Sequence, residues 1–533
     1  MTSTAPYGTS SAPSSGTLAE IRRACRAAAG HRRAEQHADG SWAADPDPRI
    51  TETALVCHAL ARPADAGDRA AAHAVRRARV WLRDAAPQRH DPAVRLLEAL
   101  LRSFALGEPE AARADLRAGH RTAPPARARL LRAVALTAPA PADPTGDGLA
   151  AATAAARLSA EADRVGKPWT RAEILAELAL VQRAAGRTAD ASATLVPLLA
   201  EQRPDGSFHS LVLTTALAFL ALDTVAPGTP PWDRARAFLL TAQRPDGTWR
   251  FCTTRIWDTA LTVRSFRSVP AFDAGCLGPA LDRLRAAQNP DGGWPCRPGL
   301  ASDYDTTAAA LIALADGAPT APRTFPTAPA GDTVLRGLAF LRAGQNATGL
   351  WPTWQSAVDP PAQDVVAHVL TALRLHRGRH RIDHRPARSW LAAQWHTDRR
   401  WTADWYRGVP YATAEAASAL PGHETARRAA DRLVTLRNPD GGWSAEPGEP
   451  STPGPTGLAL TALGAAGHPA AHPADPAVRL LLTTQRPDGS WPGTPEMYGP
   501  RPLLTHYHPH TQAFAAGGLR AVLETADGPG GAR

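Results

Sequence analysis

A short motif that recurs along the chain constrains its fold more than any other feature. The motif reads Gln, two residues, Asp-Gly, one residue and then an aromatic residue. It occurs at residues 36–42, 202–208, 243–249, 288–294 and 485–491, with degenerate copies at 345–351, 394–401 and 437–443. From residue 202 onward, successive copies begin 41 to 57 residues apart. Repeats of this length are typical of arrays of helical units.

Each copy of the motif predicts a local structure. An Ala/Leu-rich segment such as 235–242 precedes it and favours a helix. Pro-Asp-Gly then predicts a tight turn in which Gly takes a positive φ, and the aromatic ring is expected to fold back onto the Gln amide. Another Ala-rich segment, such as 306–314, follows as a second helix. Such helix pairs arranged in a ring give an all-α fold, an α/α barrel whose inner helices face a cavity.

The repeat is interrupted between residues 36 and 202 of the 533-residue chain. Residues 94–106 and 171–184 within this gap look amphipathic and helical, and residues 138–148 look like a loop. Residues 1–16 are rich in Ser, Thr, Pro and Gly and are expected to form a disordered tail. We therefore expect one helical unit over residues 30–255 and a second over 256–525.

Composition excludes several classes of protein. No apolar run approaches the roughly 18 residues of a membrane span, so no stable membrane insertion is expected. The net charge of +9 comes from dispersed arginines rather than a basic stripe, which argues against a nucleic-acid partner and favours an anionic small molecule. The five scattered cysteines suggest a reducing, cytoplasmic location. Nothing in the sequence indicates an oligomeric state.

Four further segments follow the motif in a characteristic order. They are Trp-Asp-Thr-Ala-Leu at 257–261, Asp-Tyr-Asp-Thr-Thr-Ala at 303–308, Asp-Val-Val-Ala-His-Val-Leu at 364–370, and Ser-Thr-Pro-x-x-Thr at 451–456. Together with the motif they resemble the class II terpene cyclases, a superfamily that includes squalene-hopene cyclases and class II diterpene cyclases. The resemblance implies two α/α barrels, the β and γ domains. Residues 17–29 would be the first helix of the β domain, 30–255 the inserted γ domain, and 256–525 the rest of β.

The segment at 303–307 departs from the family's Asp-x-Asp-Asp motif because Thr306 stands in place of the last carboxylate. This variant resembles the bacterial drimenyl diphosphate synthases, which act on farnesyl diphosphate. The resemblance implies that Asp305 protonates a prenyl alkene, with His368 donating a hydrogen bond to it and Asp303 orienting or reloading the proton. An alkene is a very weak base, so its protonation needs a strong, desolvated acid. The ordinary alternative is that Asp305 caps the helix expected from Thr306.

A carbocation must be shielded from water, and aromatic faces can stabilise it. Candidate substrate-binding residues near the acid are Tyr304, Trp257, Trp354, Trp405, Thr306 and Asp364. The tryptophans within the turn motif (Trp42, Trp249, Trp294 and Trp491) are expected to be structural. The chain has no Asp-Asp pair of the kind that ionises a diphosphate in class I enzymes, so the diphosphate is expected to survive.

A retained diphosphate needs positive counter-charge. Lys167 is the chain's single lysine, and it falls where class II diterpene cyclases carry a basic diphosphate ligand, with Arg164 as its nearest helper. Mg²⁺ is the expected cofactor. Its candidate ligands are Glu161 and Asp163, or Asp84 and Asp91, although solvated surface carboxylates are the ordinary interpretation of each.

The leading hypothesis is therefore an isomerase that converts farnesyl diphosphate into a bicyclic drimenyl diphosphate. One alternative lengthens the substrate to geranylgeranyl diphosphate and gives a labdane-type product. A third hypothesis, from another class, is a non-catalytic α/α-barrel binding protein, which would place Asp305 on the outside of the barrel. A prenyltransferase-like barrel would need a Zn²⁺ site of Asp, Cys and His, and no such cluster is apparent in the sequence.

Overall fold

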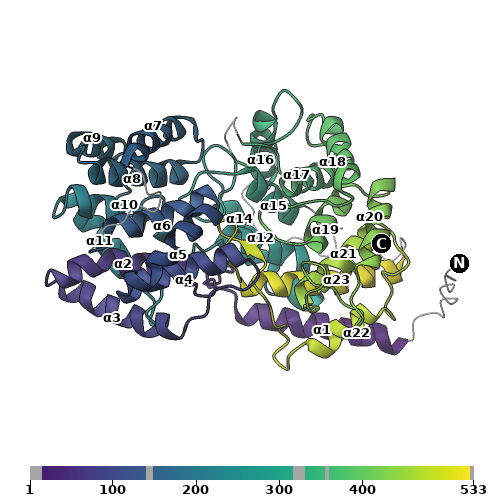
Figure 1. Cartoon of the computed structure of the whole chain (residues 1–533). Coiled ribbons are helices and arrows are strands. Elements are labelled where there is room, and N and C mark those ends of the chain that lie inside the picture. Colours follow the sequence, from purple (N-terminus) through teal and green to yellow (C-terminus); the bar gives the residue numbers. More distant parts are fainter. Residues whose placement is uncertain (1–14, 140–147, 316–329, 355–358, 529–533) are drawn as a thin grey trace, which may run out of the picture.

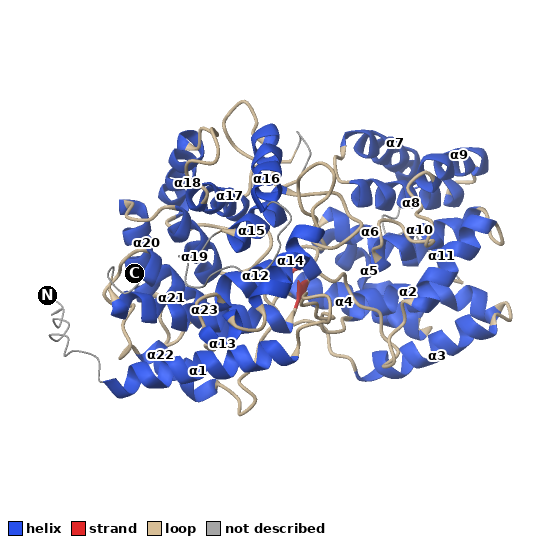
Figure 2. Cartoon of the chain, turned by 180° about the vertical axis from the view of Figure 1, so that it is seen from behind, coloured by secondary structure: helices blue, strands red, loops and turns tan. Residues whose placement is uncertain are grey.

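The structure is a computed structural model of the chain, and it describes residues 15–139, 148–315, 330–354 and 359–528 (Figure 1). Almost all of its regular structure is helical, as Figure 2 shows. The predicted tail at 1–16 and the predicted loop at 138–148 lie mostly outside the described residues. No helix in the described ranges is both long enough and apolar enough to cross a membrane.

The helices form two groups that lie side by side (Figure 1). The first group comprises α2 (Ile50–Asp65), α3 (Arg69–Asp84), α4 (Pro92–Leu106), α5 (Pro109–Thr122), α6 (Pro125–Thr137), α7 (Gly148–Arg164), α8 (Pro168–Ala184), α9 (Thr188–Leu199), α10 (Val212–Val225) and α11 (Pro230–Thr241). Helices α2, α4, α6, α8 and α10 contact one another in sequence, and α10 returns to α2. This closed ring is the inner layer of an α/α barrel.

The second group contains α1 and all helices from α12 onward. It comprises α1 (Ser15–Ala34), α12 (Arg255–Phe266), α13 (Pro270–Asp273), α14 (Leu277–Ala286), α15 (Tyr304–Leu314), α16 (Ala330–Gly344), α17 (Gln363–Leu375), α18 (Arg385–Asp398), α19 (Val409–Ala419), α20 (Glu424–Thr435), α21 (Pro453–Ala465), α22 (Pro476–Thr484) and α23 (His508–Asp527). Helices α12, α15, α17, α19, α21 and α23 form its closed inner ring. The predicted all-α fold with two α/α barrels is confirmed.

The second barrel is built from two separate parts of the chain. Ile21 and Trp42 are buried in the same apolar core as the helices from α12 onward, whereas the core of the first barrel starts at Ile50. The first barrel therefore begins after residue 42, later than the expected boundary at 30, and we propose the division at 43–49. A two-stranded hairpin, β1 (Met497–Tyr498) with β2 (Leu504–Thr505), links the barrels, because Leu503 between the strands packs into the first core.

The repeated motif builds the turn that joins an outer helix to the next inner helix. In the copy at 288–294, Gly292 has a φ of 88°, and a Cβ there would collide with the backbone of α16. The indole Nε1 of Trp294 donates to the carbonyl oxygen of Leu284 at 2.6 Å. Gln288 Nε2 donates to the Gly292 carbonyl at 2.8 Å. The ring therefore holds the end of the preceding helix through its N–H, while the Gln amide closes the turn; contact of the ring face with the Gln amide stays a prediction.

Candidate active site

An apolar cavity of about 160 Å³ lies where the two barrels meet. The first barrel contributes Trp169, Glu173, His209 and residues 211–214, and the hairpin contributes residues 497–500. The second barrel contributes Trp257, Asp303, Asp305, Thr306, Trp354 and Trp405. Asp305 thus faces an interior cavity and is only 5% exposed. The hypothesis of a non-catalytic binding protein placed Asp305 on the outside of the barrel, and this position is excluded.

Backbone geometry distinguishes the two aspartates of the acid motif. Asp303 is the N-cap of α15, and its side chain accepts hydrogen bonds from the Thr306 backbone N–H at 2.5 Å and from the Thr306 hydroxyl at 2.9 Å. Asp305 lies within the first helical turn. The expectation that α15 starts at Thr306 with Asp305 as its cap is therefore wrong by two residues. The free amides of the helix N-terminus still favour negative charge on Asp305.

His368 on α17 links Asp305 to a second carboxylate. Its Nδ1 lies 2.6 Å from Asp305 Oδ1, and its Nε2 lies 3.1 Å from Glu415 Oε2 on α19. Glu415 in turn forms a 2.8 Å ion pair with Arg264 on α12. The chain of contacts therefore runs from the cavity through Asp305, His368 and Glu415 to Arg264, with each member on a different inner helix.

The charges along this chain are strongly coupled. Burial disfavours a charged His368, but the carboxylates of Asp305 and Glu415 outweigh that effect and raise its pKa to about 10. Burial also opposes charge on Glu415, but Arg264 and His368 lower its pKa to about 2. His368 is therefore an imidazolium at neutral pH, and both of its ring nitrogens are donors. It can stabilise the carboxylate that Asp305 becomes after giving up a proton.

Asp303 behaves differently from its neighbour. Burial, together with the charge of Asp305, raises the pKa of Asp303 to about 7. A group with this pKa holds a proton in a substantial fraction of molecules at neutral pH. Asp303 is two residues from Asp305 in the chain and also lines the cavity.

Aromatic side chains enclose the acid. The Trp257 ring lies 5.5 Å from the His368 ring, and its Nε1 donates to the Tyr406 hydroxyl at 2.9 Å. Trp354 meets Trp169 of the first barrel edge to face, with ring centroids 4.7 Å apart. Three of the four predicted aromatic residues therefore line the cavity, the third being Trp405.

Three other predicted substrate contacts lie elsewhere. Tyr304 turns away from the cavity and packs against Phe340, with ring centroids 5.3 Å apart. Asp364 is buried but does not line the cavity; one of its carboxylate oxygens accepts from the backbone N–H of Trp405 at 3.2 Å and so positions that residue. Arg164 is exposed and donates to a carbonyl of its own helix. These three assignments to direct substrate contact are corrected accordingly.

Lys167 lies at the start of α8, two residues before the cavity-lining Trp169. Its Nζ is 3.7 Å from Asp359 Oδ1, and its side chain is 29% exposed. Among the described residues, the cavity lining contains no lysine or arginine. Lys167 is thus close in sequence to the cavity, bridging toward the second barrel, but is not part of its wall.

The four carboxylates predicted to bind Mg²⁺ do not form a cation site. Asp91 caps α4, and Glu161 pairs with the Arg129 guanidinium at 3.3 Å. Asp163 is exposed two residues away from Glu161 on α7, and Asp84 ends α3. In the described ranges, none of the four belongs to a group of three ligand-type side chains with ligand atoms within 4.8 Å. These residues do not fit the expected Mg²⁺, and no chemical step is derived through the ion.

Sequence reasoning missed Glu415, Arg264, Glu173 and His209. Glu415 is the single carboxylate in an otherwise uncharged α19, and a lone carboxylate in such a helix is a signal for a buried, paired group. Glu173 lines the cavity from the first barrel and pairs with Arg129 at 3.6 Å. No pattern in the sequence distinguishes Arg264 or His209.

Parts of the chain are similar in sequence to known proteins. Residues 353–521 match the squalene-hopene cyclase C-terminal domain family. A drimenyl diphosphate synthase of Streptantibioticus cattleyicolor is 31% identical over 383 residues, covering 65% of this chain and 61% of that protein. A second, from Streptomyces showdoensis, is 29% identical over 352 residues, covering 63% of this chain and 64% of that protein. The match thus spans somewhat less than two thirds of the length of these curated relatives.

The solved structure of ent-copalyl diphosphate synthase from Streptomyces platensis is similar over 95% of this chain and 99% of that one, with a TM-score of 0.55 and 20% sequence identity. At this identity the likeness shows the fold alone. The fold extends over both barrels, and the sequence similarity is highest to drimenyl diphosphate synthases among the relatives named here. The chain is thus similar in sequence to drimenyl diphosphate synthases and in fold to ent-copalyl diphosphate synthase, and its residues 353–521 match the squalene-hopene cyclase C-terminal domain family.

Proposed function

We propose that the protein is a class II terpene cyclase that converts farnesyl diphosphate into a bicyclic drimenyl diphosphate. The observation that carries the proposal is a buried carboxyl group, Asp305, which faces an apolar cavity and is backed by the charged His368. The likeness to two drimenyl diphosphate synthases supports the choice of a fifteen-carbon substrate.

The reaction begins with Asp305 as general acid. His368 donates to Oδ1, so the proton to be transferred resides on Oδ2. The terminal alkene of the substrate takes this proton and becomes a tertiary cation, and Asp305 becomes a carboxylate that the imidazolium stabilises. Two internal alkenes then attack in turn, forming two carbon–carbon bonds and a bicyclic cation. Loss of one proton from that cation restores an alkene, so the product is an isomer of the substrate with its diphosphate intact.

The cavity protects the cation from water. Trp257, Trp354 and Trp405 line it, and an aromatic face contributes about 1–2 kcal/mol to a desolvated cation. Asp303 lies next to the acid and has a pKa of about 7, so it can return a proton to Asp305 after each turnover. Asp364 supports the site through the backbone of Trp405.

The diphosphate is expected to bind near Lys167, outside the apolar wall. Lys167 Nζ now faces Asp359 Oδ1, so a diphosphate would take the place of that carboxylate as its partner. A diphosphate oxygen is a stronger acceptor for an ammonium than a carboxylate 3.7 Å away.

Product analysis tests this proposal directly. The purified protein is incubated with farnesyl and geranylgeranyl diphosphate in competition, with and without Mg²⁺, and the products are treated with phosphatase and identified by mass spectrometry. We expect a bicyclic C15 alcohol as the main product. A labdane-type C20 product would show that geranylgeranyl diphosphate, not farnesyl diphosphate, is the substrate. The absence of any cyclised product would refute the proposal.

The variant Asp305→Asn provides the matched test of the acid. It keeps the shape of the side chain but removes the transferable proton, and loss of a general acid lowers turnover by about 10²–10⁴-fold. The variant should melt like the wild type. Turnover within tenfold of the wild type would show that another group protonates the alkene.

A further inference from the structure

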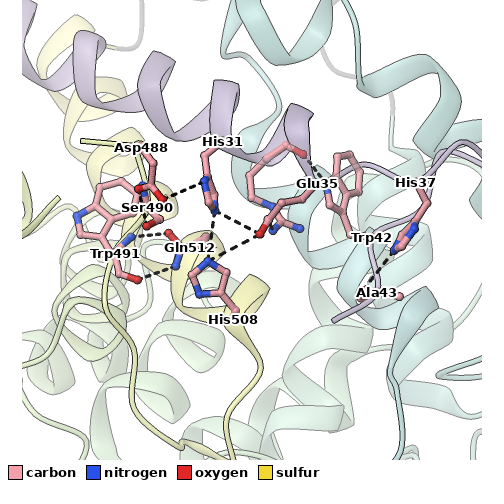
Figure 3. A network of polar contacts seen from close by, with 11 residues as sticks. His31, Glu35, His37, Trp42, Ala43, Asp488, Ser490, Trp491, His508 and Gln512 are labelled. Atoms are coloured by element: carbon pink, nitrogen blue, oxygen red, sulfur yellow. Dashed lines mark hydrogen bonds and ion pairs between the residues drawn. The ribbon is translucent and has the colours of Figure 1, made fainter. Parts of the chain in front are cut away.

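Three side chains with metal-binding atoms converge where the first and last helices of the chain meet (Figure 3). His31 lies in the last turn of α1, Glu35 directly follows its last residue, and His508 begins α23. His31 Nε2 is 3.3 Å from His508 Nε2 and 3.3 Å from Glu35 Oε1. His508 Nε2 is 3.9 Å from Glu35 Oε1. Figure 3 shows the three side chains pointing toward one another.

These separations match the edges of a tetrahedral metal site. Zn²⁺ binds imidazole nitrogen and carboxylate oxygen at about 2.0–2.2 Å, which places neighbouring ligand atoms about 3.3 Å apart. Two of the three observed distances equal this value, and the third needs only a small movement of the Glu35 side chain, which is 36% exposed. A magnesium ion fits the donors poorly because it prefers oxygen ligands.

Neighbouring residues keep two of the donors close to each other. Glu35 follows the last turn of α1 and stays within reach of His31, four residues earlier, while its other carboxylate oxygen pairs with the buried Arg32. Asp488 Oδ2 lies 3.8 Å from His31 Nδ1, on the opposite side of the ring from the cluster (Figure 3). At this distance the carboxylate attracts a charged ring without a hydrogen bond; a small approach of Asp488 would let it accept from Nδ1–H and leave Nε2 to the ion. Asp488 itself is held by the Ser490 backbone N–H at 2.9 Å.

We propose that His31 Nε2, Glu35 Oε1 and His508 Nε2 bind a divalent transition-metal ion, with Zn²⁺ the best match. The side chains of His31 and His508 are 15% and 32% exposed, so an ion can enter from solvent and water can fill a fourth position. The site is separate from the cavity and independent of the proposed cyclase reaction. Bound metal would cross-link α1 to α23 and thereby strengthen the second barrel.

Metal titration of the full-length, untagged protein tests the site. After removal of metal with a chelator, Zn²⁺ binding is measured by calorimetry and the thermal midpoint is followed with and without Zn²⁺. We expect one Zn²⁺ per chain, a higher midpoint, and the absorption of tetrahedral Co²⁺ when cobalt replaces zinc. Failure to bind one equivalent of either ion would overturn the proposal.

Variants assign the ligands. His508→Asn should weaken Zn²⁺ binding more than about 100-fold, because loss of an outer partner alone costs about 10–100-fold. Asp488→Asn should weaken it about tenfold. Glu35→Gln also removes the partner of the buried Arg32, so its thermal midpoint without metal is compared with that of the wild type; unchanged Zn²⁺ affinity in a folded Glu35→Gln would remove Glu35 from the site. His73→Ala, at an exposed histidine on α3, is the control and should bind like the wild type. Equal affinity in His508→Asn and the control would refute the ligand assignment.

Discussion

Replacing Glu415 with glutamine should lower the pKa of His368, so that its ring is neutral in a pH range where the wild-type ring is charged. The pKa of His368 rises from 6.5 to about 10 because Asp305 and Glu415 together outweigh the effect of burial. If Glu415 supplies half of this rise of about 3.5 pH units, its removal brings the pKa to about 8, a change worth about 2 kcal/mol. The unpaired charge of Arg264 lowers the pKa further. A histidine with a raised pKa is charged below that pKa and loses its proton as the pH rises through it.

Between pH 8 and 10, the wild-type His368 should therefore be charged and the variant His368 neutral. The assay is NMR of protein labelled with ¹³C in its histidine rings, titrated from pH 6 to 11. The chain has 18 histidines, and a His368→Asn sample identifies the signal. At pH 9, about nine tenths of His368 should be charged in the wild type and about one tenth in Glu415→Gln, so turnover of the variant should fall about tenfold relative to the wild type. Glu424→Gln, at an exposed carboxylate on α20, is the control. A His368 that titrates at the same pH in both proteins would refute the coupling.

Three other changes give measurable outcomes. Burial raises the pKa of Asp364 to about 7, so its contribution to folding stability is complete at low pH and is lost as the pH rises toward 7. Asp364→Asn removes this loss and should therefore stabilise the protein about 2 kcal/mol more at pH 8 than at pH 5, measured by urea unfolding. Lys167→Ala should raise the KM for the prenyl diphosphate with little change in kcat, and Lys167→Arg should restore most of the affinity; an unchanged KM would remove Lys167 from the diphosphate site. Trp443→Ala, at a buried turn-motif ring, should cost about 3–5 kcal/mol of unfolding free energy, whereas a loss below 1 kcal/mol would show the ring to be dispensable.

The repeat and the barrels were predictable because their determinants are local. The Asp-Gly pair requires a positive φ, and Gly292 adopts it. The contact of the Trp294 indole with Leu284 was not predictable in the same way, because the carbonyl it binds lies ten residues away at the end of a helix. Local chemistry thus indicated a turn and a buried ring but not the hydrogen bond that fixes them.

The acid site was predictable only in part. The segments that contain Asp305 and His368 carry the family resemblance, and the structure brings the two side chains together. Glu415 completes the site from a helix 110 residues beyond Asp305, and no sequence spacing relates the two. The Mg²⁺ candidates failed for a simpler reason: Glu161 and Asp163 are two residues apart on a helix, so their side chains diverge.

The path of the chain through the second barrel also has a consequence for its synthesis. Helix α1 leaves the ribosome long before α23, yet its apolar face packs against α23, and Gln485 donates to the carbonyl of Ala24 on α1. The helices of the first barrel are one continuous stretch, and only Leu503 of its core comes from later in the chain, so most of this barrel can fold before α23 is made. Until α23 has emerged from the ribosome, the nascent chain therefore carries the amphipathic helix α1 without its packing partner. A polypeptide truncated before α23 would leave the apolar face of α1 exposed, which favours aggregation and degradation by quality-control proteases.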